Sequence, residues 1–574
     1  SQNVAIGRGA LGAQNFTTAT NVYNVAVGPS AGTSITTGVS NTLVGGLAGD
    51  AITDADENVA VGMNALSTNT LGSSSVAIGH QALFAQNFTT ATSAYNVAVG
   101  KNAGVAVTTG QQNTLVGAFA GDALTDANEN TAVGYLALSA DTLGERSTAI
   151  GHGALASQNH TTATNADNVA VGHDAATALT TATLSTFVGA SSGAAITTGN
   201  LNAAFGYATL ATDTKGDRSV AIGAGALLVQ NFTTNTDTYN TAVGYFAGDG
   251  ISTGVKNTLV GGLAGDGLTD ADDNTIVGAF ALQTDTLGSR STAIGRGALG
   301  TQNFTTATNS DNTAVGYFAG QQITTGQQNT FIGSVAGDET TTTSNNVAVG
   351  YASLQAAAGG TDTAIGSLAL RDTTGFDNTA VGFAAGITIS SGDNNTALGH
   401  DALRSGSPGG PATTDNNVFG LGDENVASLH CQVSLTVSSD QRDKTDFVDL
   451  DLGLDFVKAL NPVTYYWDKR AKYLNKDNED GTPNEDYDLD SVTPNGTHKE
   501  DWIDVGFTAQ SVQALEEAAG YKVADKKNLT VSVNADGKQL GLRYEKFIPI
   551  LVKAIKDQDA IITSLTARVA ALES

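Results

Sequence analysis

Apolar residues recur through the first 420 residues of the chain in short alternating segments. The repeated unit is a pentad of the form N/S-x-x-φ-G, in which φ is apolar, as in N-V-A-V-G at residues 24–28. Its alternation with period two and its valine and isoleucine content are typical of a β-strand. Each pentad therefore predicts one short strand that ends at a glycine turn.

The closing glycines of the pentads are regularly spaced. Gly7, Gly28, Gly45, Gly62 and Gly79 are separated by 21, 17, 17 and 17 residues, so the pattern repeats every 72 residues. Periods of this size are typical of solenoids. We therefore predict a mainly β fold, in which residues 1–420 form a long parallel β-solenoid of 17- and 21-residue coils.

Both faces of the predicted strand are apolar. We assign Val25 and Val27 to the interior of the coil and Ala26 to its outer face. At this outer position most coils carry alanine, and a larger residue returns every 72 residues, at Leu43, Leu115, Phe187, Leu259 and Phe331. A strand that is apolar on both faces is usually buried on both faces. Because a slim coil has a single interior, we expect the outer face to meet another copy of the chain.

The pentad S-V-A-I-G at residues 75–79 resembles the head repeats of trimeric autotransporter adhesins. The resemblance implies left-handed parallel β-rolls that pack as homotrimers. The 17-residue coil of this chain is longer than the coil of those repeats, and this leaves the cross-section of the solenoid open.

Polar residues mark the turns between the predicted strands. Recurring asparagines such as Asn24, Asn41 and Asn58 predict a structural ladder rather than a ligand site, because asparagine satisfies neighbouring backbone groups in turns. Acidic turns such as T-D-A-D-E-N at residues 53–58 offer carboxylates to calcium, but they lack the spacing of known calcium loops. We favour solvated turns over calcium sites.

The 21-residue coils carry an additional segment of the form A-Q-N-F-T-T-A-T. Because the segment lies outside the minimal coil, we predict that its aromatic side chains protrude. Protruding aromatics stack on sugars or pack against a neighbouring chain, and the sequence does not choose between the two. The predicted receptor contacts are Phe16, Phe88, Phe232 and Phe304, with His160 in the remaining repeat.

Beyond residue 438 the composition becomes that of an ordinary globular domain. We predict a connecting strand within residues 421–438, a helix within 448–460 and a strand at 463–467. The last helix carries a heptad seam with one polar member, and such a seam is typical of a coiled coil, here over about residues 544–574. The seam consists of Leu551, Ile555, Gln558, Ile562, Leu565, Val569 and Leu572.

Four sequence blocks in this part carry a family resemblance. They are S-S-D-Q-R-D-K at residues 438–444, L-N-P-V-T-Y-Y-W at 460–467, D-V-G-F-T-A-Q-S-V at 504–512 and L-R-Y-E-K-F-I-P-I-L-V-K-A-I-K at 542–556. Together they resemble the C-terminal intramolecular chaperone and auto-peptidase domain of phage tail spikes and tail fibres, the endosialidase type. The resemblance implies that residues 439–574 form a smaller α+β domain that assists the assembly of trimers.

The same resemblance implies self-cleavage between Ser438 and Ser439. In this scheme Ser439 is the nucleophile and Lys444 is the general base, so the domain acts once, as a serine peptidase on its own chain. A hydroxyl and an amine five residues apart are a weak signal by themselves. The alternative is that both are surface turn residues.

Charge and composition narrow the function further. The net charge of −29 argues against electrostatic binding to nucleic acid or to an anionic membrane. The single cysteine and the lack of a Cys/His cluster with zinc spacing predict no metal site and no cofactor. No apolar run reaches the length of a membrane span, and Ser1 leads directly into a pentad, so we expect neither membrane insertion nor a secretion signal.

These observations predict a homotrimeric phage tail fibre or spike, exposed on the virion, that binds a host cell-surface receptor such as a glycan. The alternative is a trimeric adhesin on a bacterial cell surface whose C-terminal domain is not cleaved. We predict no activity on glycans, because no recurrent pair of carboxylates stands out from the acidic turns.

Overall fold

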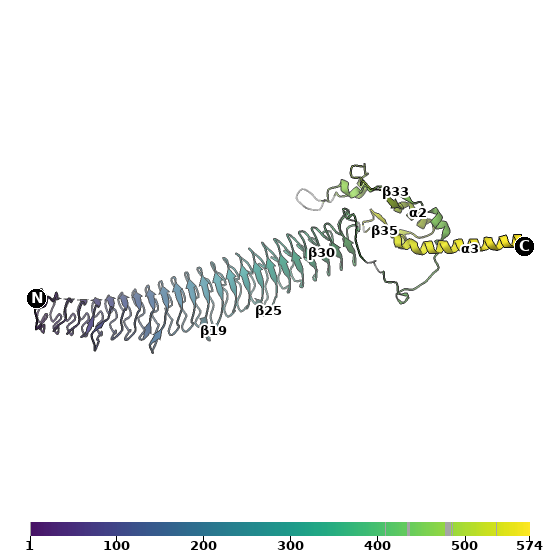
Figure 1. Ribbon diagram of the computed structural model, residues 1–574. Coiled ribbons are helices and arrows are strands. Elements are labelled where there is room, and N and C mark those ends of the chain that lie inside the picture. Colours follow the sequence, from purple (N-terminus) through teal and green to yellow (C-terminus); the bar gives the residue numbers. More distant parts are fainter. Residues whose placement is uncertain (1, 408, 433–436, 477–483, 485, 535) are drawn as a thin grey trace. The chain divides into compact units, whose positions relative to one another are not determined.

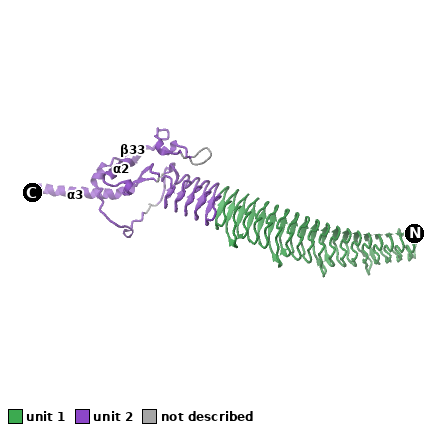
Figure 2. Cartoon of the chain, turned by 180° about the vertical axis from the view of Figure 1, so that it is seen from behind, with its two compact units in different colours: residues 1–335 green, residues 336–574 purple. Residues whose placement is uncertain are grey.

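The computed structural model describes all residues except 1, 408, 433–436, 477–483, 485 and 535. The chain forms a long parallel β-solenoid, followed by a small α/β region that ends in a long helix (Figure 1). It divides into two compact units, residues 1–335 and 336–574 (Figure 2). This architecture confirms the predicted fold class.

Unit 1 consists of solenoid coils, each with one three-residue strand taken from a pentad. The strands are β1 Val4–Ile6, β2 Val25–Val27, β3 Thr42–Val44, β4 Val59–Val61, β6 Val76–Ile78, β8 Val97–Val99, β9 Thr114–Val116, β10 Thr131–Val133, β12 Thr148–Ile150, β14 Val169–Val171, β15 Thr186–Val188, β16 Ala203–Phe205, β18 Val220–Ile222, β20 Thr241–Val243, β21 Thr258–Val260, β22 Thr275–Val277, β24 Thr292–Ile294, β26 Thr313–Val315 and β27 Thr330–Ile332. The coils stack along the axis of the unit (Figure 1).

Four of the 21-residue coils add a second, two-residue parallel pair. The pairs are β5 Gly72–Ser73 with β7 Thr92–Ser93, β11 Gly144–Glu145 with β13 Thr164–Asn165, β17 Gly216–Asp217 with β19 Thr236–Asp237, and β23 Gly288–Ser289 with β25 Thr308–Asn309. The additional residues therefore fold back onto the solenoid.

Unit 2 begins with further coils of the same kind. Their strands are β28 Val347–Val349, β29 Thr363–Ile365, β30 Thr379–Val381, β31 Thr396–Leu398 and β32 Phe419–Leu421.

Neighbouring strands pair in parallel with equal pentad positions opposite each other. Val25 pairs with Thr42, and Ala26 pairs with Leu43. The same register holds where a 21-residue coil intervenes, as between Ala149 and Ala170. Each pentad position therefore forms a continuous row along unit 1, and its exposure can be compared from coil to coil.

The middle pentad position lies inside the coil, so our assignment of the two faces is wrong. Ala26 and Leu43 have no exposed surface, and the large residues Leu115, Phe187 and Phe331 are equally buried. The flanking residues that we placed inside face outward instead. The interior of a slim coil has room for a methyl group in most coils, which explains why alanine dominates the middle position.

Glycines make room for the larger inward side chains. A Cβ at Gly32 would lie 2.6 Å from Leu43 Cδ1, and one at Gly49 would lie 2.9 Å from Leu43 Cδ2. Phe187 is accommodated in the same way, because a Cβ at Gly193 would lie 2.3 Å from its ring. Large and small residues therefore interlock between adjacent coils.

The predicted asparagine ladder is confirmed. The Asn41 backbone N–H donates to Asn24 Oδ1 at 2.8 Å, and the Asn58 N–H donates to Asn41 Oδ1 at 3.0 Å. Asn41 Nδ2 donates in turn to the carbonyl of Ala55 at 2.8 Å. These side chains are fully buried, so the ladder satisfies backbone groups that the turns leave unpaired. The acidic turns act similarly, since Asp56 Oδ1 accepts from the Val39 N–H at 2.7 Å.

The prediction that the loop aromatics protrude is wrong for three of the four phenylalanines. Phe88, Phe232 and Phe304 are 4%, 6% and 4% exposed, while Phe16 is half-buried. The second strand pair of each longer coil turns the ring inward, where Phe88 covers Gly72. In the remaining repeat His160 is also buried, and its Nδ1 lies 3.8 Å from Asp141 Oδ2.

Buried Asp141 is held by hydrogen bonds within the same coil pair. Burial raises the pKa of this carboxyl, but hydrogen bonds from His160, Gln158 and the Gly144 N–H outweigh the burial and leave the pKa below its usual range. The network links the loop of the longer coil to the preceding coil.

The rest of unit 2 is a small α/β region around one core. Its helices are η1 Gln441–Asp443, α1 Leu454–Ala459, η2 Arg470–Tyr473, η3 Leu489–Ser491, α2 Ala509–Ala518, η4 Val523–Asp525, η5 Tyr544–Lys546 and α3 Phe547–Glu573. Its strands form two antiparallel pairs, β33 Val463–Tyr465 with β34 Asp504–Gly506 and β35 Val531–Val533 with β36 Leu540–Leu542. The core consists of Leu452, Phe456, Val512, Val531, Phe547 and Ile550.

A buried carboxylate ties α2 to β35. Glu516 is 1% exposed, and its Oε1 accepts hydrogen bonds from the backbone N–H and the hydroxyl of Thr530, at 2.6 and 2.5 Å. Its Oε2 accepts from the Leu529 N–H at 3.1 Å. Charge-assisted bonds of this kind fix the strand against the helix.

Helix α1 is shorter than predicted, because it begins after Gly453, and glycine is a poor helix former. The predicted strand at 463–467 is present as β33. Within the described part of the chain, no helix combines the length and the apolar character that a membrane span requires.

Candidate functional site

The segment that leads to the predicted cleavage point is extended and exposed. Solenoid strand β32 ends at Leu421, and no strand continues through the described residues 422–432 and 437–438. The connecting strand predicted within 421–438 is therefore absent from those residues, and residues 433–436 lie outside the described part. The Ser438–Ser439 peptide bond belongs to an exposed stretch, where it is accessible to an attacking group.

The structure brings the two predicted dyad side chains together. Lys444 Nζ contacts Ser439 Oγ within hydrogen-bond distance, and it also lies 3.3 Å from the Ser439 carbonyl oxygen. The short helix η1 between the two residues turns the chain back on itself and produces this contact. A lysine amine against a serine hydroxyl is the geometry that a nucleophile and its base require. The catalytic roles of both residues stay a prediction.

An aspartate and an arginine stabilise the turn between them. Asp440 caps η1, since its Oδ1 accepts from the Arg442 N–H at 2.9 Å, while the Arg442 guanidinium reaches both carboxylate oxygens, with Nη2 at 2.6 Å from Oδ2. Hydrogen bonds from the side chain and the backbone of Arg442 lower the pKa of Asp440. The turn places Lys444 beside Ser439, so Asp440 and Arg442 are positioning residues that the sequence analysis quoted without assigning them a role.

The predicted receptor contacts do not form a comparable site. Phe88, Phe232 and Phe304 are enclosed by their own coils, which removes the ground on which we predicted contacts with a glycan. The exposed aromatic residues of unit 1 lie instead one residue after the pentad glycine, as with Tyr207 and Tyr245. Sequence reasoning missed these tyrosines because it inverted the two faces of the strand.

The third residue of each strand forms an apolar row on the outside of unit 1, which we call the outer ridge. It is valine, isoleucine or phenylalanine in every strand of the unit, because equal positions stack in register. The most exposed members, at 36% to 59%, are Ile6, Ile78, Ile150, Phe205, Ile222, Val260, Ile294 and Ile332. An apolar row of this length is typical of a surface that another protein chain covers.

Helix α3 carries a second apolar surface. Its N-terminal end belongs to the core through Phe547 and Ile550. The predicted heptad seam is solvent-exposed on the single chain, with Ile562 at 52%, Leu565 at 50% and Val569 at 51%. An exposed seam with heptad spacing is what a parallel coiled coil buries.

Comparison with known protein families gives one match. Residues 439–521 match the family described as the chaperone of endosialidase. The match begins at Ser439 and includes Lys444, α1, α2 and the pair of β33 and β34. No curated protein and no solved structure matches the chain. The chain therefore carries a region similar to the chaperone of endosialidase, which confirms the intramolecular chaperone part of the predicted architecture.

Proposed function

We propose that the chain is a homotrimeric tail fibre whose C-terminal region assists assembly and then releases itself by cleavage before Ser439. One observation carries the proposal: the family match begins at the serine against which Lys444 Nζ lies. A chaperone that is needed only during assembly can be discarded afterwards, and cleavage at this point separates it from the solenoid.

The cleavage step follows from the contact between the two side chains. Lys444, in its neutral form, takes the hydroxyl proton of Ser439, and Ser439 Oγ attacks the carbonyl carbon of Ser438. The peptide C–N bond breaks, and its nitrogen takes up the proton and becomes the new amino terminus. Water then hydrolyses the ester between the Ser438 carbonyl and Ser439 Oγ, so the products are residues 1–438 and 439–574.

Two apolar surfaces support association of the chains. The outer ridge and the α3 seam are both exposed to water on one copy, and both follow a regular repeat that a second and third copy can match. Parallel solenoids make slow, long-range contacts, so a C-terminal coiled coil that first aligns the chains would speed their assembly. The proposed role of the assembled fibre is to attach a virion to a host cell-surface receptor.

The experiment is the intact mass of the full-length chain after expression, together with its mass in solution by light scattering. We expect a trimer and two products that meet between Ser438 and Ser439. Ser439→Ala and Lys444→Ala should each yield an uncleaved trimer, because they remove the nucleophile and the base but not the fold. Ser438→Ala is the matched control and should be cleaved, because its side chain takes no part. An uncleaved wild-type trimer would contradict the cleavage.

A second candidate function is a trimeric adhesin on a bacterial cell surface that keeps its C-terminal region. The resemblance of the pentad to adhesin head repeats favours it. The same experiment separates the two candidates, since the adhesin predicts an intact wild-type chain that forms trimers.

A further inference from the structure

Two histidines and an aspartate converge on the outside of unit 1. His152 and His173 each lie two residues after a strand, β12 and β14, and these strands pair in register. Asp174 follows His173, and its backbone N–H donates to the His152 carbonyl at 2.9 Å. The stacking of two adjacent coils therefore brings together residues that are 21 positions apart in the sequence.

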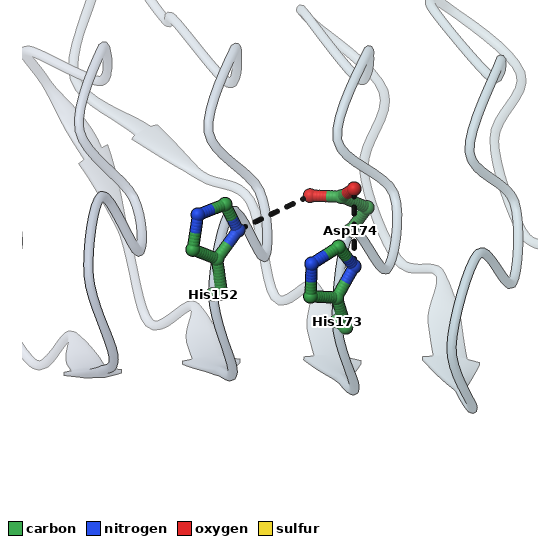
Figure 3. A group of neighbouring side chains, drawn as sticks. All are labelled: His152, His173 and Asp174. Carbon is green, nitrogen blue, oxygen red and sulfur yellow. Dashed lines mark ion pairs between the residues drawn. The ribbon is translucent and has the colours of Figure 1, made fainter.

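The ring nitrogens face the carboxylate. His152 Nδ1 lies 3.5 Å from Asp174 Oδ1, and His173 Nδ1 lies 3.1 Å from Asp174 Oδ2 (Figure 3). One ligand atom from each of the three residues lies within 4.8 Å of the others. In a tetrahedral zinc site with bonds of about 2.0–2.1 Å, neighbouring ligand atoms are about 3.3 Å apart. The two measured separations fall on either side of that value.

We propose that His152, His173 and Asp174 bind a divalent transition-metal ion of the zinc type. Two imidazoles and one carboxylate favour Zn²⁺ over Ca²⁺ or Mg²⁺, because these harder ions prefer oxygen ligands. Three protein ligands leave the remaining positions to water. The ion would link two coils of the solenoid through their side chains.

The surroundings allow the ligands to converge. The two rings are stacked, with centroids 4.8 Å apart and planes 6° apart, so at least one ring has to rotate for both lone pairs to meet at one ion. The side chains of His152 and His173 are 52% and 63% exposed, which leaves room for that rotation. Gly153 keeps the path of the carboxylate open, since a Cβ there would lie 2.5 Å from Asp174 Oδ1.

The corresponding positions of other repeats show that the array does not require these residues. Position 152 corresponds to Ala224, position 173 to Tyr245 and position 174 to Asn102. The repeat with Ala224 and Tyr245 forms the same strands, β18 and β20, in the same register. Packing of the coils therefore does not explain why two histidines and an aspartate meet in this one repeat.

A similar group in unit 2 is less suited to a metal ion. His400 lies within 3.5 Å of Asp401 and Asp423, but Lys476 Nζ already lies 3.2 Å from Asp401 Oδ2. The buried Arg404 also reaches Asp401, with Nη1 at 3.0 Å from Oδ1. The side-chain cations of this group take the place of an added one, whereas the carboxylate of Asp174 faces histidines alone among its printed ion pairs.

The test is Zn²⁺ binding to the untagged full-length chain, measured by equilibrium dialysis with metal analysis. Co²⁺ absorption in the visible range serves as a spectroscopic check of the ligand geometry. We expect one ion per chain with wild-type protein. His152→Ala, His173→Tyr and Asp174→Asn should each weaken binding roughly tenfold or more, while the solenoid fold stays unchanged by circular dichroism.

Two matched controls use the other histidines of the array. His80 occupies the position of His152 in the preceding repeat, where Lys101 stands in the place of His173. His80→Ala and His400→Ala should therefore leave both affinity and stoichiometry as in the wild type. The proposal is overturned if wild-type protein shows no saturable binding, if the three ligand variants bind as the wild type does, or if His80→Ala weakens binding to the same extent.

Discussion

Asp362 Oδ1 accepts a hydrogen bond from the backbone N–H of Asn378 at 2.8 Å, in a row where the neighbouring coils carry asparagine. The Asp362 N–H itself donates to Asn346 Oδ1 at 3.0 Å. The residue is fully buried, and its Oδ2 has no hydrogen-bond partner among the described residues. Burial raises the pKa of this carboxyl from 3.8 to about 6, against the lowering effect of its hydrogen bonds to Asn378.

Asp362 should therefore make the solenoid less stable at high pH. An acid whose pKa is higher in the folded chain holds its proton more tightly there, so the free energy of unfolding falls as the pH rises from about 4 to about 6 and stays lower above that range. The loss is about 3 kcal/mol for a shift of this size. Asp362→Asn completes the ladder and removes the penalty.

We expect Asp362→Asn to melt at a higher temperature than the wild type at pH 8, and the difference to shrink at pH 5. Asp54→Asn, at an exposed turn, is the control for the change in net charge and should show no such dependence. A difference in melting temperature that is the same at both values of pH would mean that Asp362 does not titrate in this range.

The sequence predicted the course of the chain well because the pentads repeat. In-register stacking follows from the period, and Asn24 and Asn41 occupy equal positions of successive coils, so the ladder follows too. The contact between Ser439 and Lys444 was also accessible, because a short turn separates them. These features depend on local spacing, which a single sequence displays.

The choice between the two faces of the strand was not decided by apolar pattern, because both faces are apolar. A usable signal was present in the glycines: Gly32 and Gly49 flank the large Leu43, one in its own coil and one in the preceding coil. Steric complementarity of this kind identifies the inner face. The pair of His152 and His173 was missed for another reason, since its members are joined only by the stacking of coils.

Leu115→Asp tests the corrected assignment of the faces. Leu115 is fully buried between Gly104 and Gly121, whose Cβ positions would clash with it. A carboxylate there has no partner, and burying an unpaired charge costs several kcal/mol. We expect loss of β-structure by circular dichroism, or cleavage of the surrounding coils by a protease. Val116→Asp, one residue along the strand on the outer ridge, should keep the coil folded.

Aspartate substitutions on the outer ridge should affect association rather than folding. Ile222 and Ile294 are 40% and 36% exposed in one copy, so the double change Ile222→Asp and Ile294→Asp adds charge without filling the coil. If copies meet along this row, light scattering of the isolated residues 1–438 should report monomers in place of trimers. Asn231→Asp, in an exposed loop, is the charge control. Trimers that persist in the double variant would assign the interface to another face.

The exposed seam of α3 provides a way to separate assembly from the chemistry of the dyad. Ile562 and Leu565 lie about 12 residues or more beyond the core residue Ile550, so the small α/β region should fold without them. Aspartate at both positions places like charges in the centre of a coiled coil, where they repel and lose their hydration. The chains should then remain monomers.

If assembly also activates cleavage, the double variant Ile562→Asp and Leu565→Asp should stay uncleaved even though Ser439 and Lys444 are intact. Ala567→Asp, on the side of α3 away from the seam, should form trimers and be cleaved like the wild type. The measurement is intact mass combined with light scattering on the same samples. Complete cleavage of a monomeric double variant would show that the contact between Lys444 and Ser439, which one chain forms by itself, is sufficient for the reaction, and that trimer formation does not control it.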